Sequence, residues 1–210
     1  MTDIYLASRS PRRRELLKQI GVRFEPLLIR LAGPRATGVD EAQHAGEEAA
    51  RYVERIAREK AEQGVRVLAL RSLLPRPVLA ADTVVIVDGD VLGKPADRAQ
   101  AADFLRRLSG RAHEVRTAVA LGLPGSAPFD SGARVLQAVS VSTVAFRPLG
   151  DSEIERYVAG GEPFDKAGGY GIQGLAAVFV ERLEGSYTGV MGLPLYETAQ
   201  LLKQAGFAVV

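Results

Sequence analysis

The chain has 210 residues, which is enough for one domain with a sizeable hydrophobic core. It contains no cysteine and only two histidines, so disulfides, a thiolate nucleophile, zinc–thiolate and iron–sulfur sites and a histidine-rich metal cage are excluded. Any metal must then be a hard divalent cation held by carboxylates, such as Mg²⁺ or Mn²⁺. The formal net charge is only +2, which argues against nucleic-acid binding through a broad basic face.

No segment of the chain reads as a targeting or membrane-spanning sequence. The first six residues lack the basic region and the long apolar core of a signal peptide. The longest apolar runs, such as residues 175–180, are far too short to cross a bilayer. We therefore expect a cytoplasmic protein with neither a membrane nor a nucleic acid as partner.

The N-terminal pattern predicts a strand, a tight turn and a helix. An apolar run at residues 4–7 is followed by Ser10 and Pro11, which suit the N-cap and the first position of a helix because proline fixes φ and lacks an N–H. Apolar residues then recur at helical spacing up to Gly21, a plausible helix end. Three arginines at 12–14 thus lie at the positive end of a helix dipole.

Helical and strand-like patterns alternate along the rest of the chain. We expect a loop around a short strand at 25–39, helices at 47–63, 98–108, 151–159 and 195–205, strands at 78–87, 114–122, 136–146 and 175–183, a hairpin turn at 88–90, and loops at 124–132 and 160–174; residues 68–74 are ambiguous. This order predicts an α/β fold with a mixed central sheet flanked by helices. We expect a single domain over residues 1–210, with a cleft between two lobes.

Two short motifs contain candidate ligands for phosphate or metal. At the first turn, the Ser8 and Ser10 hydroxyls, helix N–H groups and the guanidinium groups of Arg12 and Arg13 match phosphate oxygens, although a solvated helix start is equally consistent. Asp82 lies between Ala81 and Thr83 in an apolar run, where an unpaired carboxylate is costly to bury. It therefore needs a cation or a metal, unless it only caps a turn.

The most unusual stretch is residues 161–174, which contain five glycines together with Asp165, Lys166 and Gln173. This composition suggests a backbone that follows a ligand closely, or else an irregular connection. The spacing is neither a dinucleotide fingerprint nor a P-loop, and the Gln173 amide could pair with a base edge. His44 and His113 lack a catalytic partner pattern, and we expect structural or surface roles for both.

Six segments, collinear over essentially the whole chain, resemble the Maf family of nucleoside triphosphate pyrophosphatases. They are LASRSPRR at 6–13, ADTVV at 81–85, LGKP at 92–95, LSGRAH at 108–113, the stretch from GEP at 161 to QG at 174, and GLPLYET at 192–198. The stretch 165–174 is similar to the subfamily that hydrolyses dTTP and UTP rather than the 7-methyl-GTP subfamily. The resemblance implies a Maf/ITPase-like fold, a homodimer and a divalent metal.

The resemblance also implies roles for individual residues. Asp82 corresponds to the catalytic acidic residue, Arg12, Thr83 and Gln173 to specificity positions, and Glu41, Lys60 and Lys94 to further active-site positions. The cations Arg12, Arg13, Lys60, Lys94 and Lys166 would offset phosphate charge. Asp82 and Glu41 would hold the metal, or Asp82 would take a proton from water directly, and the sequence leaves these two roles open.

The function that follows is metal-assisted hydrolysis of dTTP and UTP, and of modified pyrimidine nucleotides, to the monophosphate and pyrophosphate. One alternative is a pyrophosphatase that prefers another or a modified nucleotide. A second is a nucleotide-binding regulator of cell division and septum formation that performs no hydrolysis, although a pure binder needs no acidic residue among its cations. Nucleic-acid binding through residues 12–14 is disfavoured by the near-neutral net charge.

Overall fold

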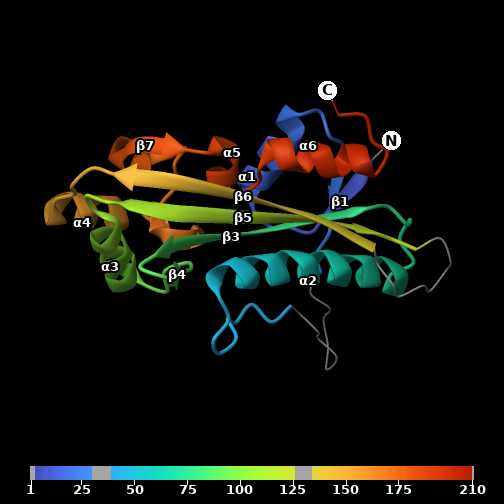
Figure 1. The fold of residues 1–210 in the computed structure, drawn as a ribbon, viewed down its shortest axis with the longest axis horizontal. Coiled ribbons are helices and arrows are strands. Elements are labelled where there is room, and N and C mark those ends of the chain that lie inside the picture. Colours follow the sequence, from blue (N-terminus) through green and yellow to red (C-terminus); the bar gives the residue numbers. More distant parts are fainter. Residues whose placement is uncertain (1–2, 30–38, 126–133, 210) are drawn as a thin grey trace. The chain divides into compact units, whose positions relative to one another are not determined.

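A computed structural model describes residues 3–29, 39–125 and 134–209, and within these ranges the fold is α/β with a mixed seven-stranded sheet (Figure 1). The strand order is β2-β1-β3-β5-β6-β7, and β4 pairs with β3. The strands are β1 (Ile4–Leu6), β2 (Phe24–Pro26), β3 (Val78–Val87), β4 (Asp90–Leu92), β5 (Ala112–Leu123), β6 (Arg134–Phe146) and β7 (Val180–Glu184). Strand β1 runs parallel to β2 and β3, whereas β4 is antiparallel to β3 and β7 is antiparallel to β6. The predicted mixed sheet is therefore confirmed.

The helices follow the predicted order. They are α1 (Pro11–Gln19), α2 (Ala49–Leu70), α3 (Arg98–Leu108), α4 (Asp151–Ala159), α5 (Tyr187–Met191) and α6 (Leu195–Gln204), with short 3₁₀ turns η1 (Glu162–Asp165), η2 (Ala167–Gly169) and η3 (Leu175–Phe179). Among the residues described, no helix has both the length and the apolar character needed to cross a membrane.

Local signals explain α1 and the β3–β4 hairpin. The Ser10 hydroxyl accepts a hydrogen bond from the Arg13 backbone N–H at 3.5 Å, Pro11 opens α1, and Gly21 beyond its end has φ +71°. Asp88 and Gly89 both have positive φ, the conformation of the two-residue turns that suit the twist of a hairpin. The predicted N-cap and hairpin are both confirmed.

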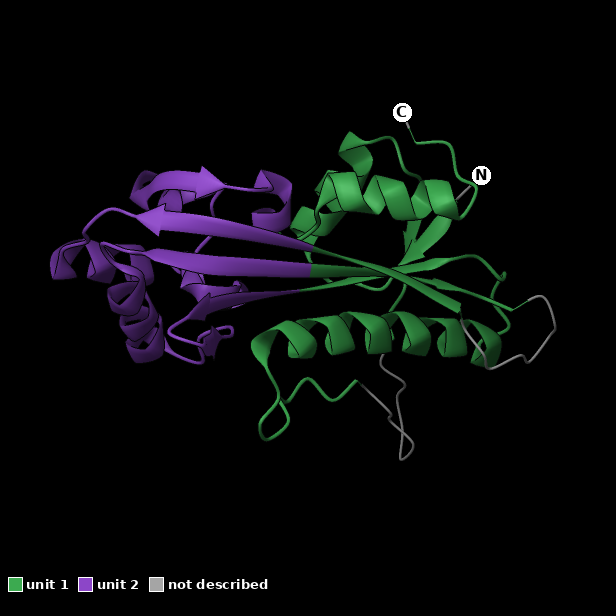
Figure 2. Ribbon diagram, viewed as in Figure 1, with its two compact units in different colours: residues 1–82, 118–139, 192–210 green, residues 83–117, 140–191 purple. Residues whose placement is uncertain are grey.

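The chain divides into two compact units, coloured in Figure 2. Unit 1 comprises residues 1–82, 118–139 and 192–210, and unit 2 comprises residues 83–117 and 140–191. Strands β3, β5 and β6 contribute residues to both units. A single domain over residues 1–210 stays a prediction.

In unit 1, α2 and α6 lie on opposite faces of the strands (Figure 1), and small residues let α2 approach the sheet closely. A Cβ added to Gly64 of α2 would lie 2.5 Å from Val78 Cγ1, and one added to Gly122 of β5 would lie 3.0 Å from the Ala61 carbonyl oxygen. Ala57 and Ala61 on α2 are fully buried. Because α2 lies so close to β3, polar side chains of the helix can reach side chains of this strand.

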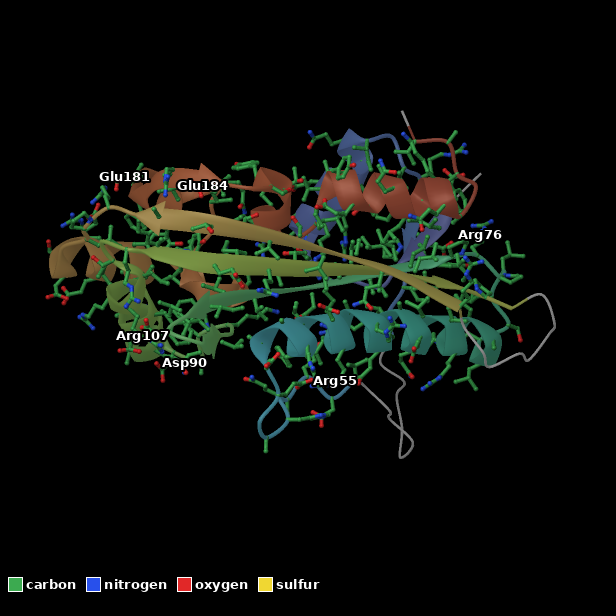
Figure 3. The ribbon with its side chains drawn as sticks, in the orientation of Figure 1. Arg55, Arg76, Asp90, Arg107, Glu181 and Glu184 are labelled. Atoms are coloured by element: carbon green, nitrogen blue, oxygen red, sulfur yellow. The ribbon has the colours of Figure 1, made fainter. Side chains whose placement is uncertain are left out.

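In unit 2, aromatic side chains fill the core. Phe146 of β6 contacts Tyr170 edge-to-face at a centroid distance of 4.8 Å, and Tyr157 of α4 contacts Phe179 at 5.1 Å. Helices α3 and α4 pack together beside these rings. Figure 3 also shows Arg107 of α3 beside Asp90 of β4, which form an ion pair of 2.7 Å.

Three elements differ from the predictions. The strand predicted at 175–183 is wrong in its first half, because Leu175–Phe179 is a 3₁₀ turn and only Val180–Glu184 is a strand. Helix α2 continues to Leu70, since Val65, Val67 and Leu68 are buried on its inner face. The short helix α5 was not predicted. Most of the loop predicted at 124–132, and residues 30–38 of the predicted loop 25–39, lie outside the described residues.

Candidate functional site

The ammonium group of Lys60 lies between two carboxylates of unit 1. Its Nζ is 2.8 Å from Asp82 Oδ1 and 2.9 Å from Glu41 Oε1. Lys60 projects from α2, Asp82 lies within β3, and Glu41 precedes α2 in the chain. The Lys60 and Asp82 side chains are only 13% and 17% exposed, whereas Glu41 is 64% exposed. One cation thus bridges two carboxylates, and the nearby Arg13 guanidinium also interacts electrostatically with both of them.

Arg55 fixes the segment that carries Glu41, residues 40–47, which we call the α2 lead-in. Its Nε and Nη2 donate to the two carboxylate oxygens of Glu47 at 2.7 and 2.8 Å, and Nη2 also donates to the Ala42 carbonyl at 2.9 Å. Figure 3 shows Arg55 on the side of α2 that faces the lead-in. Hydrogen bonds from Arg55 lower the pKa of Glu47 to about 2, so this pair stays charged across the physiological range.

A second contact fixes the Glu41 backbone itself, because the Tyr52 hydroxyl of α2 donates to the Glu41 carbonyl at 2.8 Å. Burial raises the pKa of Tyr52, as does the negative charge of Asp82. Tyr52 thus remains a neutral donor. Sequence reasoning missed Arg55, Glu47 and Tyr52, because charged residues on a helix surface are usually only solvated and carry no local signal.

Arg13 connects three segments of unit 1. Its Nε donates to the Gly192 carbonyl at 2.6 Å, and its Nη1 donates to the Ala81 carbonyl at 2.7 Å and to Ser8 Oγ at 3.4 Å. Burial lowers the pKa of this guanidinium, while the charge of Asp82 opposes that shift. Since Ala81 directly precedes Asp82, Arg13 fixes the backbone that carries the carboxylate.

The remaining predicted residues of the first turn lie beside Arg13. Ser8 Oγ accepts from the Ser10 backbone N–H at 3.2 Å, so the two serines brace the turn before α1. Arg12 lies half-buried in the first turn of α1. Unit 1 therefore contains Ser8, Ser10, Arg12, Arg13, Glu41, Lys60 and Asp82.

Unit 2 contains the other predicted site residues, Thr83, Lys94, Lys166 and Gln173. The buried Thr117 hydroxyl donates to the Gly189 carbonyl at 2.7 Å, so the 2.9 Å contact between Thr83 and Thr117 uses Thr83 as the donor. Lys94 is exposed in the turn after β4. Gln173 is exposed as well, in the glycine-rich stretch.

Lys166 is held within the glycine-rich stretch. Its Nζ donates to the Glu162 carbonyl at 2.6 Å and to Asp165 Oδ1 at 2.5 Å. A Cβ added to Gly171 would lie 2.7 Å from Lys166 Cε and 3.3 Å from Gln173 Nε2. The Lys166 methylenes and the Gln173 amide thus both lie against the bare backbone of Gly171.

The two histidines, for which we predict structural or surface roles, lie in different settings. His113 is buried and its Nε2 is 2.8 Å from the Tyr170 hydroxyl. Burial, together with the positive charge of Arg111, lowers its pKa to about 4. His44 is exposed in the lead-in.

The carboxylates around Lys60 are the candidate ligands for a divalent cation. Over residues 3–29, 39–125 and 134–209, no group of three or more His, Cys, Asp or Glu side chains could hold a metal. Asp82 Oδ1 and Glu41 Oε1 nevertheless both contact Lys60 Nζ, at 2.8 and 2.9 Å. The two carboxylate oxygens therefore lie near each other. Mg²⁺ is commonly held by one or two carboxylates with substrate phosphates and water. The two carboxylates could supply part of the ligand set of a divalent cation.

Comparison with known proteins gives consistent matches over nearly the whole chain. Residues 3–205 match the family model "Maf-like protein". The dTTP/UTP pyrophosphatase of Aromatoleum aromaticum is 57% identical over 97% of this chain and 96% of its own length. Those of Bordetella parapertussis and Chromobacterium violaceum are 56% and 52% identical, each over 98% of this chain and over 94% and 96% of their own lengths.

Among solved structures, the chain is similar to the Ham1 protein of Staphylococcus aureus. The two share 18% sequence identity over 69% of this chain and 72% of that chain, with a TM-score of 0.43. The family resemblance predicted from the six sequence segments is confirmed by the match over residues 3–205.

Proposed function

This chain belongs to the Maf family, and from that premise we propose that it hydrolyses dTTP and UTP to the nucleoside monophosphate and pyrophosphate. The observation that carries the proposal is the contact of Lys60 with both Asp82 and Glu41. A protein that only binds a nucleotide has no use for two carboxylates beside a polyanion, since they repel it. Carboxylates are useful where a metal must be held or a proton removed from water.

The unit 1 residues are assigned to the triphosphate and to a divalent cation, Mg²⁺ or Mn²⁺. Asp82 and Glu41 would hold this metal, which when bound supplies positive charge to the phosphate oxygens and lowers the pKa of water. Arg12 and Lys60 would offset the charge of the phosphates, with Lys94 and Lys166 of unit 2 in the same role. Arg13 contributes by position, because two of its donors already bind the Ala81 and Gly192 carbonyls.

In the reaction, water adds across the bond between the α and β phosphates. The new bond joins the water oxygen to phosphorus, and the bridging oxygen leaves with the electron pair as part of pyrophosphate. The proton lost by water would pass to the Asp82 carboxylate, which is the alternative to its role as a metal ligand, and Lys60 orients its Oδ1. Positioning and charge stabilisation supply most of the rate enhancement in phosphoryl transfer, and the fixed cations of this chain provide both.

Thr83 and Gln173 are assigned to the base. A pyrimidine such as uracil or thymine presents both donors and acceptors on its pairing edge, and a glutamine amide also offers both. The hydrogen bond from Thr83 to Thr117 fixes the orientation of the Thr83 hydroxyl. Arg12 belongs with them as a specificity position in the family.

Asp82→Asn tests the proposed chemistry. We expect kcat for dTTP and UTP to fall by about 1,000-fold or more, because the amide neither accepts the proton nor holds a cation as a carboxylate does. Binding of UTP should persist, since the amide oxygen can still accept from Lys60. The control is Asp103→Asn on the exposed face of α3, which should match the parent chain. Turnover near the parent value in Asp82→Asn would contradict the assignment.

We also propose that the protein is a cytoplasmic homodimer with one functional domain per chain, as the family resemblance implies. Light scattering after size exclusion, at several concentrations, measures the mass directly. A mass of one chain at micromolar concentration would overturn the dimer without affecting the assignment of the chemistry.

A further inference from the structure

Residues 170–175, which we call the Gln173 segment, are buried over their first three positions and come to the surface at Gln173. Tyr170 and Ile172 are buried, whereas Gln173 and Leu175 are exposed. An exposed amide on a glycine-rich backbone has many accessible conformations, and ordering it at the moment of binding costs free energy. A side chain that selects a base through directed hydrogen bonds therefore needs a backbone that is already fixed.

The N-terminal end of the segment is fixed by a buried hydrogen bond. The Tyr170 hydroxyl lies 2.8 Å from His113 Nε2, and both side chains are about 95% buried. Phe146 packs edge-to-face against each ring, at centroid distances of 5.0 Å to His113 and 4.8 Å to Tyr170. The other histidine nitrogen, Nδ1, is buried without a hydrogen-bond partner, so the contact with Tyr170 is the ring's only polar contact among the described residues.

The C-terminal end is fixed by the Glu162 carboxylate. Its Oε2 accepts from the Leu175 N–H at 2.9 Å, and its Oε1 accepts from the Tyr157 hydroxyl at 3.0 Å and from the Ala176 N–H at 3.4 Å. These N–H groups open the η3 turn, where no intrahelical acceptor exists. A Cβ on Gly174 would lie 2.4 Å from Oε1, so the carboxylate reaches the turn only because residue 174 is glycine.

The middle of the segment rests on Lys166, which is itself bound to Glu162. Lys166 Nζ donates to the Glu162 carbonyl, and its methylenes lie where a side chain on Gly171 would be. The same absent side chain would lie 3.3 Å from Gln173 Nε2. Glu162 therefore makes two kinds of contact. Its carboxylate binds the C-terminal end of the segment, and its carbonyl binds Lys166.

We infer that His113 and Glu162 are positioning residues for base selection: they fix the two ends of the Gln173 segment so that the Gln173 amide meets the pyrimidine in one orientation. The inference rests on the proposed role of Gln173 in reading the base. Neither residue touches the substrate. Their effect should therefore appear in the preference for one nucleotide over another, and much less in the rate at which a poorly selected nucleotide is hydrolysed.

Tyr170→Phe is the most conservative test, because it removes one hydroxyl and keeps the ring in the aromatic cluster. We expect kcat/KM for UTP to fall about tenfold, mainly through KM, while kcat/KM for CTP stays within about twofold, so that the UTP-to-CTP ratio falls about tenfold. Glu162→Gln should lower the ratio by a similar factor, since its amide nitrogen cannot accept a backbone N–H. Tyr187→Phe, at a tyrosine that is 46% exposed, is the matched control and should leave both values unchanged.

The single variant Gln173→Ala and the double variant Gln173→Ala/Tyr170→Phe separate the inference from the function on which it rests. If Gln173→Ala alone leaves the UTP-to-CTP ratio unchanged, the base-reading role is wrong. If it lowers the ratio and Tyr170→Phe lowers it no further in that background, the two residues act through one contact, as we infer. If kcat/KM falls equally for UTP and CTP in a folded Tyr170→Phe variant, the hydroxyl has a structural role only and the inference is overturned. That result would be decisive without data on Glu162→Gln.

Discussion

The Lys60 contact in unit 1 and the Gln173 segment in unit 2 are held in place by different forces. Lys60, Asp82 and Glu41 come from three segments and are joined by ion pairs in a partly exposed setting. The Gln173 segment is a continuous stretch held by buried hydrogen bonds and by glycines that leave room for Glu162 and Lys166. The first arrangement concentrates charge, which suits bond breaking for any nucleotide. The second fixes direction, which suits choice between nucleotides.

The largest effect is expected at Lys60. Lys60→Met keeps most of the side-chain volume but leaves two carboxylates without their shared cation, so they repel each other and the triphosphate. We expect kcat to fall by about 100-fold or more, by the same factor for UTP, dTTP and CTP, in a pyrophosphate-release assay. Lys203→Met, on the exposed face of α6, is the control. If kcat fell by different factors for UTP, dTTP and CTP, Lys60 would also act in base selection, contrary to the role given to it here.

His113 should give unit 2 a pH dependence of stability. Its folded-state pKa of about 4 lies below the ordinary value of 6.5, because burial disfavours the charged ring. Above pH 6.5 both states are neutral at this site. As the pH falls from 6.5 to 4 only the unfolded state takes up the proton, so stability is lost over that window, by on the order of 3 kcal/mol.

The measurement is urea unfolding of the parent chain and of His113→Gln at intervals from pH 7.5 to 4. Because glutamine does not titrate, the difference in unfolding free energy between the two proteins should narrow as the pH falls below 6.5. If the difference in unfolding free energy between the two proteins did not change with pH, His113 would not stay neutral in the folded protein.

A smaller effect is expected at Arg55, which tests whether the α2 lead-in must be fixed. Arg55→Gln removes the paired hydrogen bonds to Glu47 and the contact with the Ala42 carbonyl, so the lead-in is held by fewer contacts, with the Tyr52 hydroxyl still bound to the Glu41 carbonyl. We expect the Mg²⁺ concentration for half-maximal activity to rise about tenfold, with partial recovery of rate at high Mg²⁺. Arg58→Gln, exposed on the same helix, should behave as the parent chain. If the Mg²⁺ concentration for half-maximal activity did not change, Arg55 would have no role in positioning Glu41.

Local patterns were sufficient to predict the elements with strong end signals. Ser10 and Pro11 specify the start of α1, and Asp88 and Gly89 specify the β3–β4 turn, because cap and turn geometry depend on adjacent residues only. The strand predicted at 175–183 is wrong in its first half because the Leu175 N–H binds Glu162, thirteen residues earlier in the chain. That contact is tertiary and overrides the propensity of the run.

The candidate site could be predicted as a set of residue types but not as an arrangement. Asp82 and Lys60 are 22 residues apart, and their contact depends on how closely α2 approaches β3, which Gly64 against Val78 sets. No periodicity reveals that distance. Arg55, Glu162 and the Tyr170 hydroxyl were missed for the same reason, since each acts on a segment that lies elsewhere in the sequence.

The most direct measurement is product release from dTTP, UTP, CTP, GTP and 7-methyl-GTP, with phosphate and pyrophosphate assayed separately in Mg²⁺, in Mn²⁺ and in EDTA. We expect pyrophosphate, not phosphate, from dTTP and UTP, with little from the other nucleotides and none in EDTA. A folded protein that binds UTP but releases no pyrophosphate from any nucleotide would contradict it, and would favour a nucleotide-binding regulator instead.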